Sequence, residues 1–165
     1  MLGPLLEERG LARHRGGIIL VRELGSTTLA SSVEMSPTRS DEWTDVLAAQ
    51  ADRGGTSRPI IERLLDGHTA PTAYGLIRER DEPVAIGMAV VIEGHVAIFN
   101  MYTAESHRRQ GLARSVVQAM MAFGHGAGAT RAFLQVHPAN TSALALYISQ
   151  GFSLRYEYWY HHARQ

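Results

Sequence analysis

Apolar and polar positions divide the first third of the chain into short elements. A short helical pattern of leucines ends near Gly10, and the run from Ile18 to Leu24 is typical of a strand bounded by glycine. An apolar period of two residues from Leu29 to Met35 predicts a second strand. Ser40 precedes acidic residues that suit the positive end of a helix, so we expect a helix from there to about Gly54–Gly55.

The middle of the chain predicts an antiparallel meander. A helix over about 58–66 comes first, and three apolar runs follow at 73–80, 84–93 and 95–103. The connections between these runs are short enough for hairpins. Since strands joined in this way usually pair as neighbours, we expect three consecutive antiparallel strands.

Two more pairs of helix and strand end the chain. The apolar period becomes helical from Arg109 until glycines near 124–128 end the helix, and Arg131 to Val136 predicts a strand. A helix over Asn140 to Gln150 then ends at a glycine, and an aromatic strand follows over Phe152 to Tyr160. The whole order predicts an α+β fold built around one sheet.

The last strand is rich in aromatic residues. Alternation places Tyr156, Tyr158 and Tyr160 on one face and Trp159 on the other. We expect one of these two sets to lie in the core. This strand and the one at 18–24 offer edges that can pair between subunits, which indicates a possible homodimer.

Composition narrows the class of protein. Of the 165 residues 45% are hydrophobic, and sixteen basic residues balance sixteen acidic ones. This balance gives no net field toward nucleic acid or an anionic membrane. The absence of cysteine excludes disulfides, thiolate metal sites and cysteine nucleophiles, and no apolar run is long enough to span a bilayer. We therefore expect a cytoplasmic protein of single-domain size.

The stretch from Met101 to Arg114 carries the candidate chemistry. It reads M-Y-T-A-E-S-H-R-R-Q-G-L-A-R, where a strand ends and a helix begins over the pattern R-x-x-G-x-A. The start of a helix leaves backbone N–H groups without partners and gathers partial positive charge, and both features favour phosphate binding. Gly111 and Ala113 have small side chains that let phosphates approach these amides. The neighbouring arginines oppose the helix dipole, and a bound anion would offset that cost.

Other binding motifs are absent from the sequence. There is no G-x-x-x-x-G-K-[ST] phosphate loop, and no G-x-G-x-x-G follows the first strand. The eight histidines show no metal-ligand spacing on a helix, so we expect no metal site. These absences leave the helix start near residue 110 as the main binding candidate.

Two motifs in this sequence resemble those of one enzyme family. The residues Arg108, Gly111 and Ala113 resemble motif A of the GNAT N-acetyltransferase superfamily, whose pattern is Arg/Gln-x-x-Gly-x-Gly/Ala at a strand-to-helix turn. The run L-Q-V-H-P-A-N-T-S-A-L-A-L-Y-I-S-Q-G-F, from Leu134 to Phe152, looks like motif B of the same family. Two motifs in the family's order are more specific than either motif alone.

This resemblance implies a fold and a division of the chain. It covers about residues 27–160, so we expect an acetyltransferase domain over 26–165 and an extension of a short helix and strand over 1–25. The family fold is α+β, with a central mixed and largely antiparallel sheet that is flanked by helices. The sheet is splayed at its fourth strand, and the cofactor fills the opening.

The resemblance also implies roles for individual residues, with acetyl-CoA as the cosubstrate. The backbone of Met101, Tyr102 and Thr103 would pair with the pantetheine arm, and Asn140 would lie beside it. Tyr147 would direct its hydroxyl at the cofactor sulfur and protonate the departing thiolate as a general acid. The residues around the helix start that would bind the diphosphate are Arg108, Arg109, Gln110, Gly111, Leu112, Ala113 and Arg114.

The implied activity is transfer of an acetyl group to a primary amine of a small molecule or an amino-acid-like substrate. Some relatives carry a glutamate within the fourth strand, whereas this chain has Ala97-Ile98-Phe99 there. Two alternatives stay open, namely acetylation of a protein or peptide amine and a non-catalytic module that binds acyl-CoA. Candidates for the acceptor site include Trp43, Asn100, Tyr102 and the aromatic strand. A further candidate is the loop from Arg53 to Pro59, in which Arg58 would pair with a substrate carboxylate.

Overall fold

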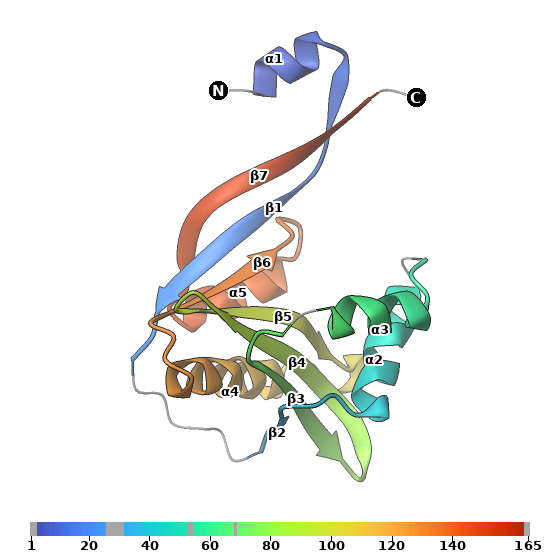
Figure 1. Cartoon of the computed structure of the whole chain (residues 1–165), viewed down its shortest axis with the longest axis vertical. Helices are drawn as coiled ribbons and strands as arrows, with labels where there is room; N and C mark the ends of the chain where they lie inside the picture. The colour runs from blue at the N-terminus through green and yellow to red at the C-terminus, as the bar shows by residue number, and fades with distance from the viewer. Residues whose placement is uncertain (1–2, 26–31, 53–54, 68, 164–165) are drawn as a thin grey trace. The chain divides into compact units, whose positions relative to one another are not determined.

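Two compact units make up the described part of the chain. The computed structural model describes residues 3–25, 32–52, 55–67 and 69–163. One unit comprises residues 23–133, and the other combines residues 1–22 with residues 134–165. Figure 1 labels the helices and strands of both units.

The larger unit contains an antiparallel sheet. Its strands, in spatial order, are β2 (Glu34–Ser36), β3 (Thr72–Glu79), β4 (Glu82–Ile92) and β5 (His95–Thr103). Each of these strands is antiparallel to its neighbour. The meander predicted from the short connections is therefore confirmed. The strand expected over Leu29–Met35 lies partly outside the described residues, and β2 overlaps its described end.

Helices flank this sheet. They are α2 (Asp41–Asp52), α3 (Arg58–Asp66), the 3-10 turn η1 (Glu105–His107) and α4 (Leu112–Gly126). Ser40 caps α2 as predicted, since its Oγ accepts a hydrogen bond from the backbone N–H of Trp43 at 3.1 Å. The helix expected from Arg109 begins only at Leu112, because Arg109 and Gly111 have positive φ angles of 66° and 85°.

The two faces of the sheet in the larger unit carry side chains of different size. On one face, α2 and α3 cover a core of large residues, namely Trp43, Ile61, Leu65, Tyr74, Leu76, Ile86, Met88 and Val90. On the other face lies α4 (Figure 1), which is close to glycines in β3 and β4. A Cβ added at Gly87 would lie 2.5 Å from Val116 Cγ1, and one at Gly75 would overlap Met120 Cε. A larger residue at either position would push α4 away from the sheet.

The smaller unit contains both ends of the chain. Its elements are α1 (Gly3–Glu8), β1 (Leu11–Glu23), α5 (Thr141–Ser149), β7 (Ser153–Ala163) and the second half of β6 (Arg131–Val136). β1 lies between β6 and β7 and is antiparallel to β7, with Leu11 opposite Ala163 and Val21 opposite Ser153. The leading helix, the two late strands and α5 are confirmed. β1 begins at Leu11 rather than at the expected Ile18.

β1 and β7 pair to form what is here called the ribbon. The expectation that one set of aromatic residues in β7 lies in the core is wrong. Tyr156, Tyr160 and Trp159 are 56%, 55% and 43% exposed, so residues of both faces contact solvent. The rings lie against the backbone of β1 instead of entering a core. A Cβ added at Gly16 would lie 2.6 Å from Trp159 Cδ1, and one at Gly17 would overlap the ring of Tyr158.

Candidate functional site

A sharply turned loop joins β5 to α4. After η1, Arg109 and Gly111 both adopt left-handed backbone angles, with φ of 66° and 85°. Glycine adopts this conformation freely, but arginine rarely does. Such strain persists only where surrounding contacts hold it, and it gathers at binding sites. The loop is therefore a candidate binding site on backbone geometry as well as on sequence.

The loop presents a set of backbone donors. The first hydrogen bond of α4 runs from the N–H of Ser115 to the carbonyl of Gly111, at 3.1 Å. Within the described residues, no protein acceptor pairs with the backbone N–H groups from Arg109 to Arg114. Gly111 has no side chain to cap them, and the positive end of the α4 dipole adds to their charge. An anion at this point satisfies donors that the protein leaves open.

The space in front of these donors is open. A Cβ added at Gly111 would meet no described heavy atom within 4 Å. The side of the loop at which a side chain would project is therefore accessible to a ligand. This open side suits a phosphate group, whose oxygens need close approach to backbone amides.

The three arginines in the loop and in the first turn of α4 have different surroundings. Arg108 Nε donates to the carbonyl of Thr103 at 3.4 Å, and its Nη1 lies 3.6 Å from Glu105 Oε1. Arg108 therefore braces the loop on the end of β5. Arg109 and Arg114 are exposed, and neither forms an ion pair within the described residues. Their guanidinium groups are available to an anion at the start of α4.

β5 contains a bulge just before the loop. Met88 of β4 pairs with Phe99 and Ile86 pairs with Tyr102, so Gly87 opposes two residues, Asn100 and Met101. Asn100 has a φ of 52°, which asparagine tolerates better than most residues. The extra residue of a bulge leaves the ladder locally unpaired and turns the strand. The bulge was not predicted from the sequence, although Gly87, an isolated glycine within a strand, is a signal for one.

Two predicted site residues lie on α5 in the smaller unit. Asn140 caps this helix, and its Oδ1 accepts a hydrogen bond from the N–H of Ala143 at 3.2 Å. Tyr147 is 6% exposed, and its ring packs edge-on against Phe152 with centroids 6.1 Å apart. Burial raises the pKa of the Tyr147 phenol above its usual value, so the hydroxyl stays protonated at neutral pH.

The predicted residues thus fall into two groups. Met101 to Thr103 and Arg108 to Arg114 belong to the larger unit, where the hydrogen bond from Arg108 to Thr103 joins them directly. Asn140 and Tyr147 share one helix of the smaller unit.

Two acceptor candidates are already engaged within the protein. Trp43 is 1% exposed, and its Nε1 lies 3.2 Å from Gly75 O and 3.3 Å from Gly87 O. It therefore anchors α2 to β3 and β4 and cannot contact an acceptor. Arg58 is the first residue of α3 rather than a loop residue, and three carboxylates surround its guanidinium.

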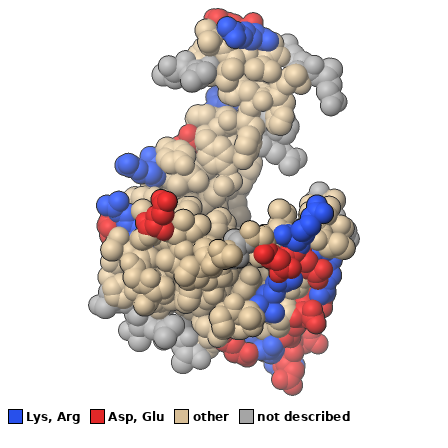
Figure 2. All heavy atoms as spheres, viewed as in Figure 1, with Lys and Arg blue, Asp and Glu red and all other residues tan. Residues whose placement is uncertain are grey.

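The carboxylates around Arg58 come from both helices. Its Nη2 lies 3.0 Å from Asp41 Oδ1, its Nε lies 2.8 Å from Glu62 Oε1, and its Nη1 contacts Asp45. Figure 2 shows charged side chains of both signs gathered over this part of the larger unit. Three carboxylates against one guanidinium give the surface of α2 and α3 a local negative excess.

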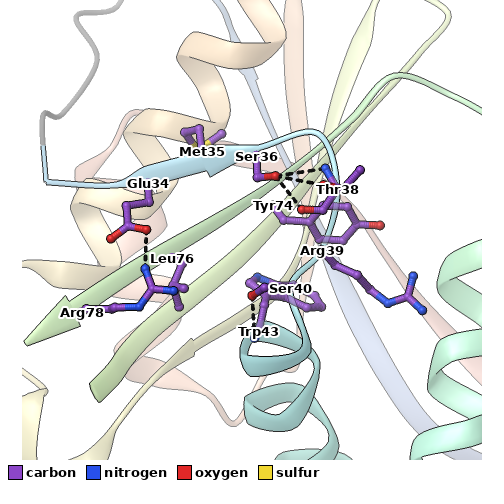
Figure 3. Close-up of a pocket in the computed structure, with 10 residues that line it drawn as sticks. All are labelled: Glu34, Met35, Ser36, Thr38, Arg39, Ser40, Trp43, Tyr74, Leu76 and Arg78. Atoms are coloured by element: carbon purple, nitrogen blue, oxygen red, sulfur yellow. Dashed lines mark hydrogen bonds and ion pairs between the residues drawn. The ribbon is translucent and has the colours of Figure 1, made fainter. Parts of the chain in front are cut away.

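A pocket of about 240 Å³ with a mixed polar and apolar lining opens between β2, β3 and the start of α2 (Figure 3). Its arginines are paired, since Arg39 contacts Asp66 and Arg78 contacts both Glu34 and Glu42. None of the predicted cofactor-binding residues lines it. The pocket is therefore separate from the loop at the start of α4.

Two further features bear on the class of site. Within the described residues, no three His, Asp or Glu side chains lie close enough together to hold a metal ion. The described helices include none with the length and apolar character needed to cross a membrane.

Comparisons with known proteins place the chain in a family. The model of the acetyltransferase (GNAT) family matches residues 34–152. An uncharacterized N-acetyltransferase, YobR of Bacillus subtilis, is 30% identical over 120 residues, which cover 73% of this chain and 47% of that protein. The chain thus spans about half the length of this curated relative.

Solved structures share the fold. A GCN5-related N-acetyltransferase from Kribbella flavida superposes with a TM-score of 0.68 at 22% identity, covering 99% of this chain and 64% of that one. Another, from Sphaerobacter thermophilus, gives a TM-score of 0.70 at 14% identity, covering 96% and 54%. At these identities the likeness concerns the fold alone.

Proposed function

Because this chain belongs to the GNAT family of acetyltransferases, we propose that it transfers an acetyl group from acetyl-CoA to a primary amine of a small molecule. The observation that supports this most directly is the open set of backbone N–H groups from Arg109 to Arg114. These donors and the two unpaired arginines suit the diphosphate of coenzyme A. The thioester of acetyl-CoA supplies the activated acyl group.

In this proposal the end of β5, just before the loop, binds and orients acetyl-CoA. The backbone from Met101 to Thr103 pairs with the amide groups of the pantetheine arm like an added strand. The bulge at Asn100 and Met101 interrupts the ladder with β4, and the extra residue of a bulge stays out of that ladder. A backbone N–H released from the ladder here would stabilise the oxyanion that forms when an amine attacks the acetyl carbonyl.

Tyr147 acts as the general acid in this proposal. The amine nitrogen forms a bond to the acetyl carbon, and the carbon–sulfur bond then breaks. The departing thiolate takes the phenolic proton of Tyr147, which burial keeps in place at neutral pH. The nitrogen releases its surplus proton to water, and Tyr147 regains a proton from water. The products are an N-acetyl amine and a free thiol.

The surface of α2 and α3 favours a cationic acceptor. Asp41, Asp45 and Glu62 outnumber the one arginine that they surround, and the side chain of Asp41 is 97% exposed. Free primary amines are mostly protonated at neutral pH, so a negative field raises their local concentration. A small basic amine is therefore favoured over an acidic acceptor.

A thermal-shift titration with acetyl-CoA tests the donor site. A ligand that binds only the folded state stabilises it by about 2.7 kcal/mol at a hundredfold excess over Kd. We expect a clear rise in melting temperature with acetyl-CoA and a smaller one with ADP. The absence of any shift with acetyl-CoA would overturn the proposed function.

A screen of amines for thiol release tests the reaction itself. The sequence contains no lysine, because all sixteen basic residues are arginine. Side-chain self-acetylation on lysine therefore contributes nothing to the signal, and thiol release reports the added amine. A protein or peptide acceptor is supported instead if peptides react and small amines do not.

We also propose that two copies of the chain pair through β7. This strand ends the strand order of the sheet, so one of its edges has no strand beside it within the described residues. Figure 2 shows mainly uncharged atoms along the ribbon, and Tyr156 and Trp159 are half exposed. Two β7 edges can pair in antiparallel fashion about a twofold axis. Sedimentation equilibrium should give twice the monomer mass, and a monomer at all concentrations would contradict the pairing.

A further inference from the structure

We propose that the side chain of Asn100 orients the acceptor amine by accepting a hydrogen bond from its N–H at Oδ1. This inference rests on the acetyl transfer proposed above and deepens it, because it assigns a side chain to the attacking nucleophile. The bulge, the contacts of the carboxamide and the face of the sheet on which it lies all support this role.

The bulge holds Asn100 in a fixed conformation. Gly87 lies opposite Asn100 and Met101, and its carbonyl accepts a hydrogen bond from Trp43 Nε1 at 3.3 Å. The buried indole therefore supports β4 at the position of the bulge. With its φ of 52°, Asn100 presents its side chain differently from a regular strand residue.

Only one end of the Asn100 carboxamide is engaged. Nδ2 donates to the sulfur of Met88 at 3.6 Å, which fits the weak acceptor character of a thioether. Within the described residues, no group donates to Oδ1. The side chain is only partly buried, so this oxygen is an acceptor that a bound molecule can reach.

The face of the sheet also fits an acceptor. Met88 belongs to the core under α2 and α3, so its contact with Asn100 places the carboxamide on that same face. Met101, the next residue, contacts the opposite face, where its sulfur lies close to Gly87. The bulge thus separates a residue that faces the carboxylate-rich helices from one that faces α4.

The chemistry of a carboxamide matches this position. An attacking amine must direct its lone pair at the acetyl carbon, and a hydrogen bond from one N–H to Oδ1 restricts its rotation. Asn100 cannot take up a proton, so the surplus proton of the attacking nitrogen is still released to water. The rate with saturating donor should therefore rise with pH until the amine itself is deprotonated, with no separate acidic limb from an enzyme base.

Two substitutions test the role of the side chain. Asn100→Gly keeps the left-handed backbone and removes only the carboxamide. We expect kcat/KM for the amine to fall roughly tenfold or more, as for loss of one hydrogen bond to the nucleophile, while KM for acetyl-CoA stays the same. Asn100→Asp keeps the size and adds a carboxylate, which should extend the activity to lower pH.

A control at the far end of β5 separates backbone from side-chain effects. Glu93, in the turn before β5, also has a positive φ of 47° and an exposed side chain. Glu93→Gly should leave both kinetic constants unchanged. Unchanged kcat/KM for the amine in Asn100→Gly would overturn this inference alone. If the wild-type chain binds acetyl-CoA but acetylates no amine, the proposed function fails, and this inference fails with it.

Discussion

Replacement of Gly111 by alanine tests the donor site most directly. Gly111 has a φ of 85°, and an added Cβ would touch no described atom within 4 Å. The methyl group therefore costs the protein only its backbone strain, about 1 to 2 kcal/mol for a left-handed alanine. For a domain of this size each kcal/mol lowers the melting temperature by about 2 to 4 °C.

The loss of acetyl-CoA affinity should be larger than this strain explains. The methyl group projects into the open space from which a phosphate reaches the backbone N–H groups of the loop. Loss of one hydrogen bond to a charged group costs about 1.5 to 3 kcal/mol. At 1.4 kcal/mol per decade, the dissociation constant of acetyl-CoA should rise by about tenfold to a hundredfold. Calorimetric titration of both proteins with acetyl-CoA measures this change.

Gly128→Ala is the matched control for this experiment. Gly128 follows the other end of α4, has a φ of 87° and also has no described atom within 4 Å of an added Cβ. The fifteen residues of α4 place it about 22 Å from the loop. This variant should lose similar stability and keep its affinity for acetyl-CoA. Equal affinities in both variants would refute the reasoning that backbone amides at Gly111 hold the diphosphate.

Three further substitutions test other parts of the site. Tyr147→Phe should lower kcat and leave acetyl-CoA affinity unchanged. Because burial raises the folded-state pKa of Tyr147, the wild type should also lose more stability than the variant as the pH rises above about 10. Urea unfolding at several pH values measures this difference. Asn140→Ala removes the cap of α5 and should cost about 1 kcal/mol, whereas Asn140→Ser should restore most of it in the same unfolding assay. Trp43→Phe leaves the carbonyls of Gly75 and Gly87 without the indole N–H and should cost about 1 to 3 kcal/mol, and calorimetric melting that shows no loss would contradict the anchoring role.

Local patterns in the sequence were sufficient to predict most elements of the fold. The helix over 58–66 and the strand over 131–136 have the expected bounds, and Ser40 caps its helix as expected. These features depend on residues close in the sequence, such as a hydroxyl before acidic residues or an apolar period. Short connections likewise predicted the antiparallel meander.

Features that depend on distant contacts were not predicted. One of the two aromatic sets of β7 was expected in the core, but Gly16 and Gly17 let the rings of Trp159 and Tyr158 lie on the neighbouring strand instead. Arg58 was treated as a loop residue, although its three carboxylate partners come from α2 and α3. In each case the decisive partner lies elsewhere in the chain, where periodicity gives no information.

Gly87 lies between the loop proposed to bind the donor and the residue proposed to orient the acceptor. It lies under Val116 of α4 on one face and opposite Asn100 on β5. A donor that tightened the start of α4 would therefore act on the backbone beside the proposed acceptor site, and linkage requires the influence to be mutual. We expect an ordered kinetic scheme in which the amine binds better after acetyl-CoA, with product inhibition patterns as the measurement.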